Sequence, residues 1–218
     1  MANPVIECVK KNHIIAIVRG ADFSKCDAIA DALYEGGIRL MEITYSRSNP
    51  DISTETAKTI GSLAERFMGE MFIGAGTVTS PELAELTVAN GGSFMAAPNT
   101  DINVISKAKE LGLCCIPGAM TPTEILTAHS AGADAVKLFP AGDLGPGYLK
   151  SIRAPISDVD IIAFGGINRD NLGVFLRNGA IGAGISSVLI KREWLDNNEY
   201  RKITDAARSL TEVLNGLN

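Results

Sequence analysis

Short apolar runs recur along the chain, separated by stretches in which apolar residues return every three or four positions. The short runs are continuous rather than alternating, which is typical of parallel strands buried on both faces. The candidate strands are Ile14–Val18, Leu40–Thr44, Met71–Ala75, Phe94–Ala97, Cys114–Pro117, Ala135–Leu138, Asp160–Phe164 and Ile181–Ile185. The candidate helices between them are Cys26–Tyr34, Pro81–Ala89, Ile102–Leu111, Thr123–Ala131 and Arg169–Asn178.

This alternation of strands and helices predicts an α/β fold. The candidate strands begin 20–31 residues apart, the length of one strand–helix unit. Eight such units in one chain favour a (β/α)8 TIM barrel over an open doubly wound sheet, which the same alternation also permits. Glycines follow several candidate helices, as C-caps do: Gly36, Gly91, Gly112, Gly132 and Gly179.

Two segments lie outside these units. Pro4–Lys11 is expected to form an extra N-terminal helix that covers the bottom of the barrel. Glu199–Leu217 carries apolar residues on one helical face and is expected to be an outer helix. No linker or low-complexity tract divides the sequence, so we expect a single domain over residues 1–218.

Composition narrows the class of protein. Of the 218 residues, 46% are hydrophobic and 21% are charged, and the net charge of −5 is too modest for a disordered chain. The acidic balance offers no basic face for nucleic acid, and no apolar stretch is long enough for a membrane span. The four cysteines form no C-x-x-C pair and the N-terminus lacks an apolar signal-peptide centre, so we expect reduced thiols and a cytoplasmic protein.

Lys137 stands out because it interrupts an apolar strand sequence near the strand's carboxyl end, where barrels gather their functional groups. A lysine that points into a barrel is desolvated, which lowers its pKa and frees a neutral amine. Such an amine can attack a ketone and form a Schiff base. The alternative is a lysine whose ammonium group extends to solvent.

Glu42 is the second ionisable group within an apolar run. A carboxylate among Leu, Met and Ile is costly to bury unless it is paired or protonated. Its pKa could therefore rise to suit general acid–base catalysis, with Lys137 as its partner across the barrel. The alternative is a structural Lys–Glu ion pair without chemistry.

Glycine-rich turns follow the last two candidate strands. Gly165 and Gly166 precede a helix, and the run 182–187 ends in Ser186 and Ser187. Backbone N–H groups at such turns, together with a helix N-terminus, can bind phosphate, and barrels commonly do so at this place. Tight loops also need glycine for conformational reasons. The location of these two turns, after the last two candidate strands, nevertheless favours a phosphate site.

The sequence offers little for a metal or a nucleotide cofactor. His13 precedes the first candidate strand and His129 lies in a helical segment, so neither has partners at metal-ligand spacing. No G-x-G-x-x-G or P-loop motif is present. We therefore expect no metal site and no organic cofactor.

Four motifs, in their order and spacing, resemble those of the 2-keto-3-deoxy-6-phosphogluconate (KDPG) and 4-hydroxy-2-oxoglutarate (KHG) aldolases. The motifs are Gly37–Thr44, Gly74–Val78, Pro117–Glu124 and Val136–Pro140. The similarity extends through nearly the whole chain. It implies a TIM barrel, a lyase that forms a Schiff base with its substrate without a cofactor, and a homotrimer.

The resemblance also implies roles for individual residues. Lys137 would be the Schiff-base lysine and Glu42 the residue that transfers protons. Arg19 and Thr77 would contact the carboxylate and keto group of the pyruvate portion. Further contacts would come from Phe139, which walls the site, and from the phosphate ligands Gly165, Gly166 and Ser187.

Two departures from the family pattern affect the substrate. The arginine that often follows the glutamate is displaced, which makes Arg47 a candidate carboxylate ligand. Phe164 stands where the family usually has a threonine. The related 6-phosphogalactonate aldolases also lack this threonine, and Pro98 with Asn99 resembles their pattern.

These observations are compatible with more than one related substrate. The expected reaction is cleavage of KDPG to pyruvate and glyceraldehyde 3-phosphate, with the galactonate epimer as the alternative. A sugar-phosphate epimerase or isomerase that uses Glu42 as a base, or a non-enzymatic sugar-phosphate-binding barrel, would have no need of Lys137 as a nucleophile.

Overall fold

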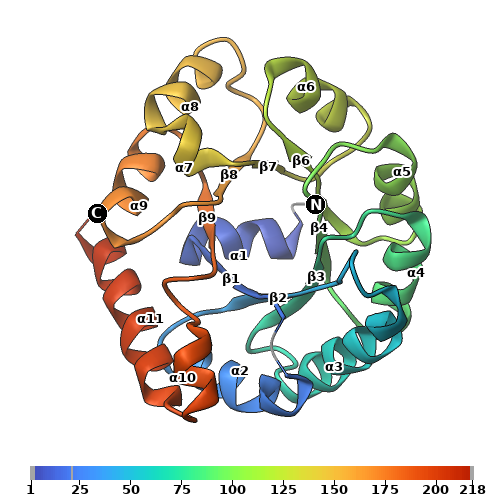
Figure 1. The fold of residues 1–218 in the computed structure, drawn as a ribbon. Coiled ribbons are helices and arrows are strands. Elements are labelled where there is room, and N and C mark those ends of the chain that lie inside the picture. Colours follow the sequence, from blue (N-terminus) through green and yellow to red (C-terminus); the bar gives the residue numbers. More distant parts are fainter. Residues whose placement is uncertain (1–2, 21, 217–218) are drawn as a thin grey trace.

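Parallel strands form a closed barrel that is surrounded by helices (Figure 1). The computed structural model describes residues 3–20 and 22–216. Every strand pairing is parallel, and the strand order is β5-β4-β3-β2-β1-β9-β8-β7-β6. The nine strands are β1 Ile14–Val18, β2 Leu40–Thr44, β3 Phe72–Gly76, β4 Phe94–Ala96, β5 Cys114–Ile116, β6 Gly118–Ala119, β7 Val136–Leu138, β8 Ile161–Phe164 and β9 Gly182–Ile185.

Nine strands make an eight-position barrel because β5 and β6 are separated by Pro117 alone. The backbone N–H of Ala97, beyond β4, donates to the Ile116 carbonyl, and that of Lys137 on β7 donates to the Pro117 carbonyl. The segment therefore bonds to β4 on one side and to β7 on the other, which closes the sheet. Proline has no N–H to donate and interrupts the strand, and the predicted strand Cys114–Pro117 did not include the continuation Gly118–Ala119.

Apart from α1, the helices surround the barrel and follow the strands in sequence (Figure 1). The α-helices are α1 Pro4–Asn12, α2 Cys26–Glu35, α3 Ser53–Arg66, α4 Pro81–Ala89, α5 Ile102–Glu110, α6 Pro122–Ser130, α7 Ala141–Leu144, α8 Pro146–Arg153, α9 Arg169–Arg177, α10 Arg192–Asp196 and α11 Tyr200–Asn215. Two short 3-10 helices complete the set, η1 Phe23–Lys25 and η2 Pro50–Ile52. None of the described helices is long and apolar enough to cross a membrane.

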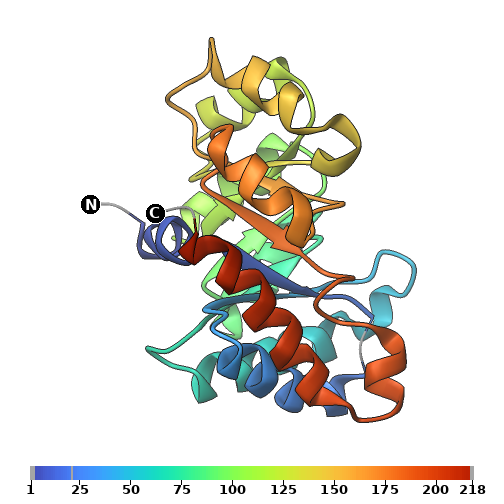
Figure 2. The ribbon, with the colours of Figure 1, turned by 90° about the vertical axis from the view of Figure 1, so that its left-hand side faces the viewer.

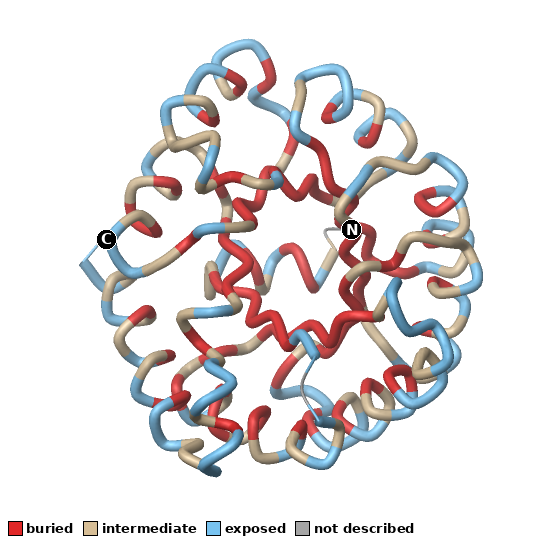
Figure 3. The backbone as a smooth tube through the Cα atoms, viewed as in Figure 1, coloured by how far each residue is buried: buried red, intermediate tan, exposed pale blue. Residues whose placement is uncertain are grey.

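Side chains alternate between the barrel interior and the layer under the helices. On β1, Ile15 and Ile17 belong to the interior cluster, whereas Ile14, Ala16 and Val18 pack beneath the helices. The same alternation on β2 and β7 directs Glu42 and Lys137 inward, since Met41, Ile43, Val136 and Leu138 pack outward. Figure 3 shows the resulting ring of buried strands around the barrel axis.

Helix α1 covers the amino end of the barrel. Its buried residues Val5, Ile6 and Val9 join the interior cluster, and Asn3 caps the helix by accepting a hydrogen bond from the Val5 N–H. Figure 2 shows α1 at one end of the molecule and the loop after β2 projecting at the opposite end. The carboxyl ends of the strands therefore surround the open mouth.

The predicted barrel, the N-terminal helix and the outer C-terminal helix are all confirmed. The predicted strands agree with the observed ones to within one residue at most ends. Leu217, the last residue of the predicted outer helix, lies outside the described residues. Four helices, α3, α7, α8 and α10, were not among the predicted ranges.

Candidate active site

The Lys137 side chain lies inside the barrel rather than extending to solvent. It is 5% exposed, and its position on β7 directs it inward beside two aromatic rings. The amine nitrogen Nζ is 4.4 Å from the centroid of the Phe164 ring and 5.3 Å from that of Phe139. The amine therefore occupies an apolar, poorly hydrated place, as the Schiff-base hypothesis requires.

Glu42 is fully buried on β2, with 0% of its surface exposed. Neither carboxylate oxygen has a hydrogen-bond partner among the described residues. Gly76 on the neighbouring strand β3 makes room for the carboxylate, because a Cβ atom there would lie 2.5 Å from Oε1. A buried carboxyl group with unused hydrogen-bonding capacity is suited to exchange protons with a bound molecule.

Burial shifts both groups toward their neutral forms. Desolvation raises the pKa of Glu42, and the positive charges of Lys137 and Arg19 oppose this shift. Desolvation lowers the pKa of Lys137, the carboxylate of Glu42 opposes it, and Arg19 reinforces it. Burial thus favours the neutral form of the amine, which is the nucleophilic one, and makes the carboxylate of Glu42 a stronger acceptor of protons.

A cavity of about 120 Å³ opens above Lys137. It brings together most of the residues that the sequence analysis assigned to substrate. Those residues are Arg19, Lys137, Phe139, Gly165, Gly166 and Ser187.

The turns after β8 and β9 present backbone N–H groups to this cavity. The N–H groups of Gly166 and Ser187 donate to no other described residue. The N-terminus of α9, by contrast, is already capped, because the Asn168 side chain accepts from the N–H groups of Asp170 and Asn171. The turns therefore keep N–H groups free to bind an anion, at Gly166 and Ser187, where the sequence analysis expected phosphate ligands.

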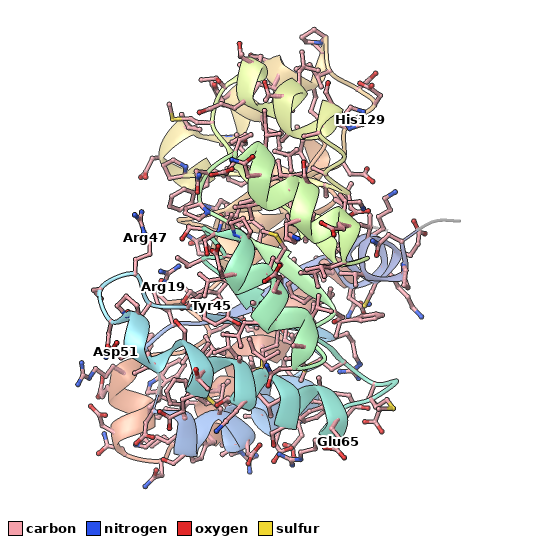
Figure 4. All side chains as sticks on the ribbon, turned by 90° about the vertical axis from the view of Figure 1, so that its right-hand side faces the viewer. Arg19, Tyr45, Arg47, Asp51, Glu65 and His129 are labelled. Atoms are coloured by element: carbon pink, nitrogen blue, oxygen red, sulfur yellow. The ribbon has the colours of Figure 1, made fainter. Side chains whose placement is uncertain are left out.

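A second cavity of about 600 Å³ adjoins the first and shares Arg19 with it. Arg47 and Thr77 also line it, so three predicted substrate contacts meet there. Figure 4 shows Arg19 and Arg47 at the same end of the molecule, opposite α1. Both guanidinium groups are exposed at the barrel mouth, where they can attract an anion.

Thr77 adopts an unusual backbone conformation directly after β3, with a φ of +60°. A β-branched residue rarely occupies this left-handed region, which costs it about 1–3 kcal/mol. Such strain is retained where the surrounding structure and function require it. Its place in the second cavity, next to Gly76 and Glu42, marks Thr77 as a functional candidate.

Two groups of predicted residues lie away from these cavities. Pro98 lines neither of them and instead packs against the backbone of Gly118. His13 is the C-cap residue of α1, with Nδ1 2.8 Å from the Ile181 carbonyl oxygen, and His129 lies on α6 (Figure 4). Within residues 3–20 and 22–216, no three His, Cys, Asp or Glu side chains gather as a metal site would require.

Three further lining residues were not among the predicted substrate contacts, although Phe164 was noted as a departure from the family pattern. Phe164 and Gly184 border the Lys137 cavity, and Tyr45 borders the second one. Tyr45 is buried after β2, and its hydroxyl lies 3.1 Å from the Thr87 hydroxyl oxygen on α4. An apolar run gives no signal for these roles, because a phenyl ring in the core and a phenyl ring beside a reactive amine have the same sequence pattern.

Comparison with known proteins agrees with this geometry. The family model for KDPG and KHG aldolases matches residues 5–206. The 2-dehydro-3-deoxy-6-phosphogalactonate aldolase of Escherichia coli K12 is 34% identical over 182 residues, which cover 83% of this chain and 86% of that relative. This chain belongs to the KDPG and KHG aldolase family. It is therefore an aldolase, a lyase that cleaves carbon–carbon bonds.

Other relatives and solved structures extend the similarity. A probable 2-dehydro-3-deoxy-6-phosphogalactonate aldolase of Rhizobium meliloti is 36% identical over 179 residues, or 82% of each chain. The native KDPGal structure superposes with a TM-score of 0.83 at 28% identity, covering 94% of this chain and 95% of that one. The KDPG aldolase of Legionella pneumophila, with pyruvate captured as a covalent carbinolamine, has a TM-score of 0.84 at 25% identity and covers 94% and 97%.

Proposed function

We propose that this aldolase cleaves a 2-keto-3-deoxy-6-phospho sugar acid through a Schiff base on Lys137. The observation that carries the proposal is a lysine, 5% exposed, whose side chain points into the barrel, where its charge interacts with that of a fully buried glutamate. Burial lowers the pKa of this lysine, which favours the neutral form of the amine that acts as a nucleophile. The covalent carbinolamine with pyruvate in the Legionella pneumophila relative supports the same chemistry here.

In the first step, the Lys137 amine attacks the C2 ketone of the substrate. The resulting carbinolamine loses water and becomes a protonated imine. The positively charged imine withdraws electrons from C3 and so prepares the C3–C4 bond for cleavage.

In the second step, Glu42 accepts the proton of the C4 hydroxyl and the C3–C4 bond breaks. The bonding electrons move toward the imine and give an enamine on Lys137, while C4 leaves as the aldehyde of glyceraldehyde 3-phosphate. Protonation of the enamine at C3 and hydrolysis of the imine then release pyruvate and restore the amine. Positioned general acid–base catalysis of this kind contributes about 10²–10⁴-fold to the rate.

The two cavities suit the two anionic ends of such a substrate. The free N–H groups of Gly166 and Ser187 can donate to the phosphate. Arg19, Arg47 and Thr77 supply two positive charges and a hydroxyl for the carboxylate. Phe139 forms an exposed wall of the Lys137 cavity.

The finer part of the proposal is the stereochemistry at C4 of the substrate, which distinguishes the gluconate compound from its galactonate epimer. The sequence analysis placed the gluconate substrate first and the galactonate epimer second. The 34% and 36% identical relatives are named for the galactonate substrate, whereas a KHG/KDPG aldolase of Escherichia coli is 31% identical. We therefore favour 2-keto-3-deoxy-6-phosphogalactonate, and a comparison of kcat/KM for the two epimers tests this preference.

Borohydride trapping tests the Schiff base directly. The protein is incubated with pyruvate, reduced with borohydride and digested, and the mass gain is mapped to a peptide. The proposal expects one adduct on Lys137, and Lys137→Ala is expected to abolish both adduct and cleavage while the protein remains folded. Absence of the adduct in the wild-type protein would instead favour an epimerase that uses Glu42, or a sugar-phosphate-binding barrel.

The proposal includes assembly as a homotrimer. Exposed apolar side chains lie on and beside α5 and α6, where a partner subunit could cover them. They are Ile102, 54% exposed, Leu126, 46% exposed, and Met120, 44% exposed. Light scattering tests the trimer, and charged substitutions at Ile102 and Leu126 are expected to yield monomers if this face forms the interface.

A further inference from the structure

The Lys137 amine lies between two phenyl rings that differ in their surroundings. The Phe139 ring is 39% exposed at the mouth of the cavity, whereas the Phe164 ring is 1% exposed. The nearer ring is the buried one, with its centroid 4.4 Å from Nζ against 5.3 Å for Phe139. Phe164 therefore forms the inner wall beside the amine, and Phe139 forms the outer wall.

The Phe164 ring is held in place by a glycine on the neighbouring strand. Phe164 on β8 pairs in register with Gly184 on β9. A Cβ atom at Gly184 would overlap the Cδ1 and Cε1 atoms of the ring. The ring thus fills the space that any other residue at position 184 would need.

The backbone alone does not explain a glycine at position 184. Gly184 has no positive φ, so alanine could adopt its conformation. The obstacle to a larger residue is the Phe164 ring, which would have to move. Lys137 lies on β7, on the other side of Phe164 from Gly184, with its amine 4.4 Å from the ring centroid. A displacement of the ring would therefore be transmitted to the amine.

We propose that Phe164 is a positioning residue that fixes the Lys137 amine and excludes water from its inner side, and that Gly184 is required to admit the ring. This inference rests on the proposed role of Lys137 as the nucleophile. The aromatic face attracts an ammonium group within about 6 Å, and the ring's bulk desolvates it. Phe164 would therefore govern both the placement and the hydration of the reacting nitrogen.

The test is a double-mutant cycle of Gly184→Ala, Phe164→Leu and their combination. The readout is the rate of borohydride trapping with pyruvate as a function of pH. Gly184→Ala is expected to slow trapping about tenfold, the equivalent of roughly 1.4 kcal/mol, because the new methyl group displaces the ring. Phe164→Leu is expected to move the half-rise of the profile upward by about one pH unit, because water that reaches the amine past the smaller side chain stabilises the ammonium form by more than the lost attraction of the ring.

In the combined variant, leucine leaves room for the new methyl group, so its trapping profile is expected to match that of Phe164→Leu alone. Gly182→Ala serves as the matched control on the same strand. A Cβ atom at Gly182 would crowd Val9 and the His13 carbonyl at the opposite end of the barrel. This control is expected to lower Tm but to keep the wild-type pH profile.

Two results would overturn the inference. One is a Phe164→Leu profile that superposes on the wild type. The other is a Gly184→Ala loss of equal size in both backgrounds. If Gly184→Ala does not fold, the pH profile of trapping in Phe164→Leu still tests the inference. Failure of the wild-type protein to form any adduct would instead remove the role of Lys137, and this inference with it.

Discussion

The carboxylate of Glu42 lies against Gly76 of the neighbouring strand, so closely that a Cβ atom there would be 2.5 Å from Oε1. Gly76 has no positive φ, so alanine is compatible with its backbone, and its methyl group would push against the carboxylate and Thr44. We expect Gly76→Ala to lower kcat about tenfold or more while pyruvate trapping on Lys137 continues. The two assays on one preparation check this.

Gly147→Ala on α8 is the matched control for that substitution, because nothing lies within 4 Å of a Cβ atom at that position. It is expected to retain the wild-type kcat. Equal activity of Gly76→Ala and the wild type would show that the carboxylate does not need its observed position.

Glu42→Gln keeps the shape of the side chain and removes its ability to exchange protons. We expect imine formation to continue and kcat to fall about 10²–10⁴-fold. Burial raises the pKa of Glu42 above its ordinary 4.5, so the acid limb of wild-type activity should lie above that pH and should vanish in the variant. An unchanged rate or an unchanged acid limb would remove Glu42 from the mechanism.

Thr77 combines a strained backbone with a hydroxyl group beside the second cavity. Thr77→Gly is expected to relieve about 1–3 kcal/mol of strain, partly offset by the entropy of glycine. Thr77→Val keeps the strain and the shape but loses the hydroxyl. Both variants should raise KM about tenfold if the hydroxyl binds the carboxylate, and only Thr77→Gly should raise Tm. A KM unchanged in both would exclude a contact with substrate.

Cys26 provides a test of burial on the outer side of the barrel. Burial raises the pKa of its thiol from 9.0 to about 11, with smaller contributions from Asp27 and Asp22. Between these pH values the unfolded chain loses the thiol proton while the native protein keeps it. The free energy of unfolding should therefore fall with rising pH, by up to about 1.4 kcal/mol per pH unit from this group.

Urea unfolding at pH values on both sides of 9.0 checks this prediction, with Cys26→Ala as the comparison. The variant should lose stability from its smaller side chain at every pH, yet its pH slope above 9.0 should be shallower. Identical slopes in the two proteins would contradict it.

The sequence predicted the barrel well because its strands are buried on both faces and its helices are amphipathic. The sequence predicted the structure less well where contacts between distant segments determine where an element begins or ends. The predicted fifth strand ended at Pro117, whereas the strand continues beyond it as Gly118–Ala119, because hydrogen bonds to the neighbouring strands persist on both sides. The helices α7 and α10 are only four and five residues long, too short for a periodic pattern.

The residues of the candidate site likewise divide into those that the sequence predicted and those that depend on packing between strands. Lys137 and Glu42 were found because charges within apolar runs are costly, a rule that depends on composition alone. The positive φ of Thr77 and the contact of Phe164 with Gly184 depend on packing between neighbouring strands. The capping of α9 by Asn168 and Asn171 likewise depends on side-chain contacts, and it occupies N–H groups of the helix terminus that the sequence analysis expected to assist the glycine-rich turns.

Helix α1 has a consequence for the order of events in catalysis. Because Val5, Ile6 and Val9 fill the amino end of the barrel, molecules reach Lys137 through the mouth at the carboxyl ends of the strands. In the proposed Schiff-base mechanism, the compound bound to the lysine would lie deeper than the aldehyde that reacts with it. Pyruvate would therefore enter before the aldehyde in condensation, and the aldehyde would leave before pyruvate in cleavage. Because both compounds pass through the same mouth, we expect the enzyme to follow ordered kinetics.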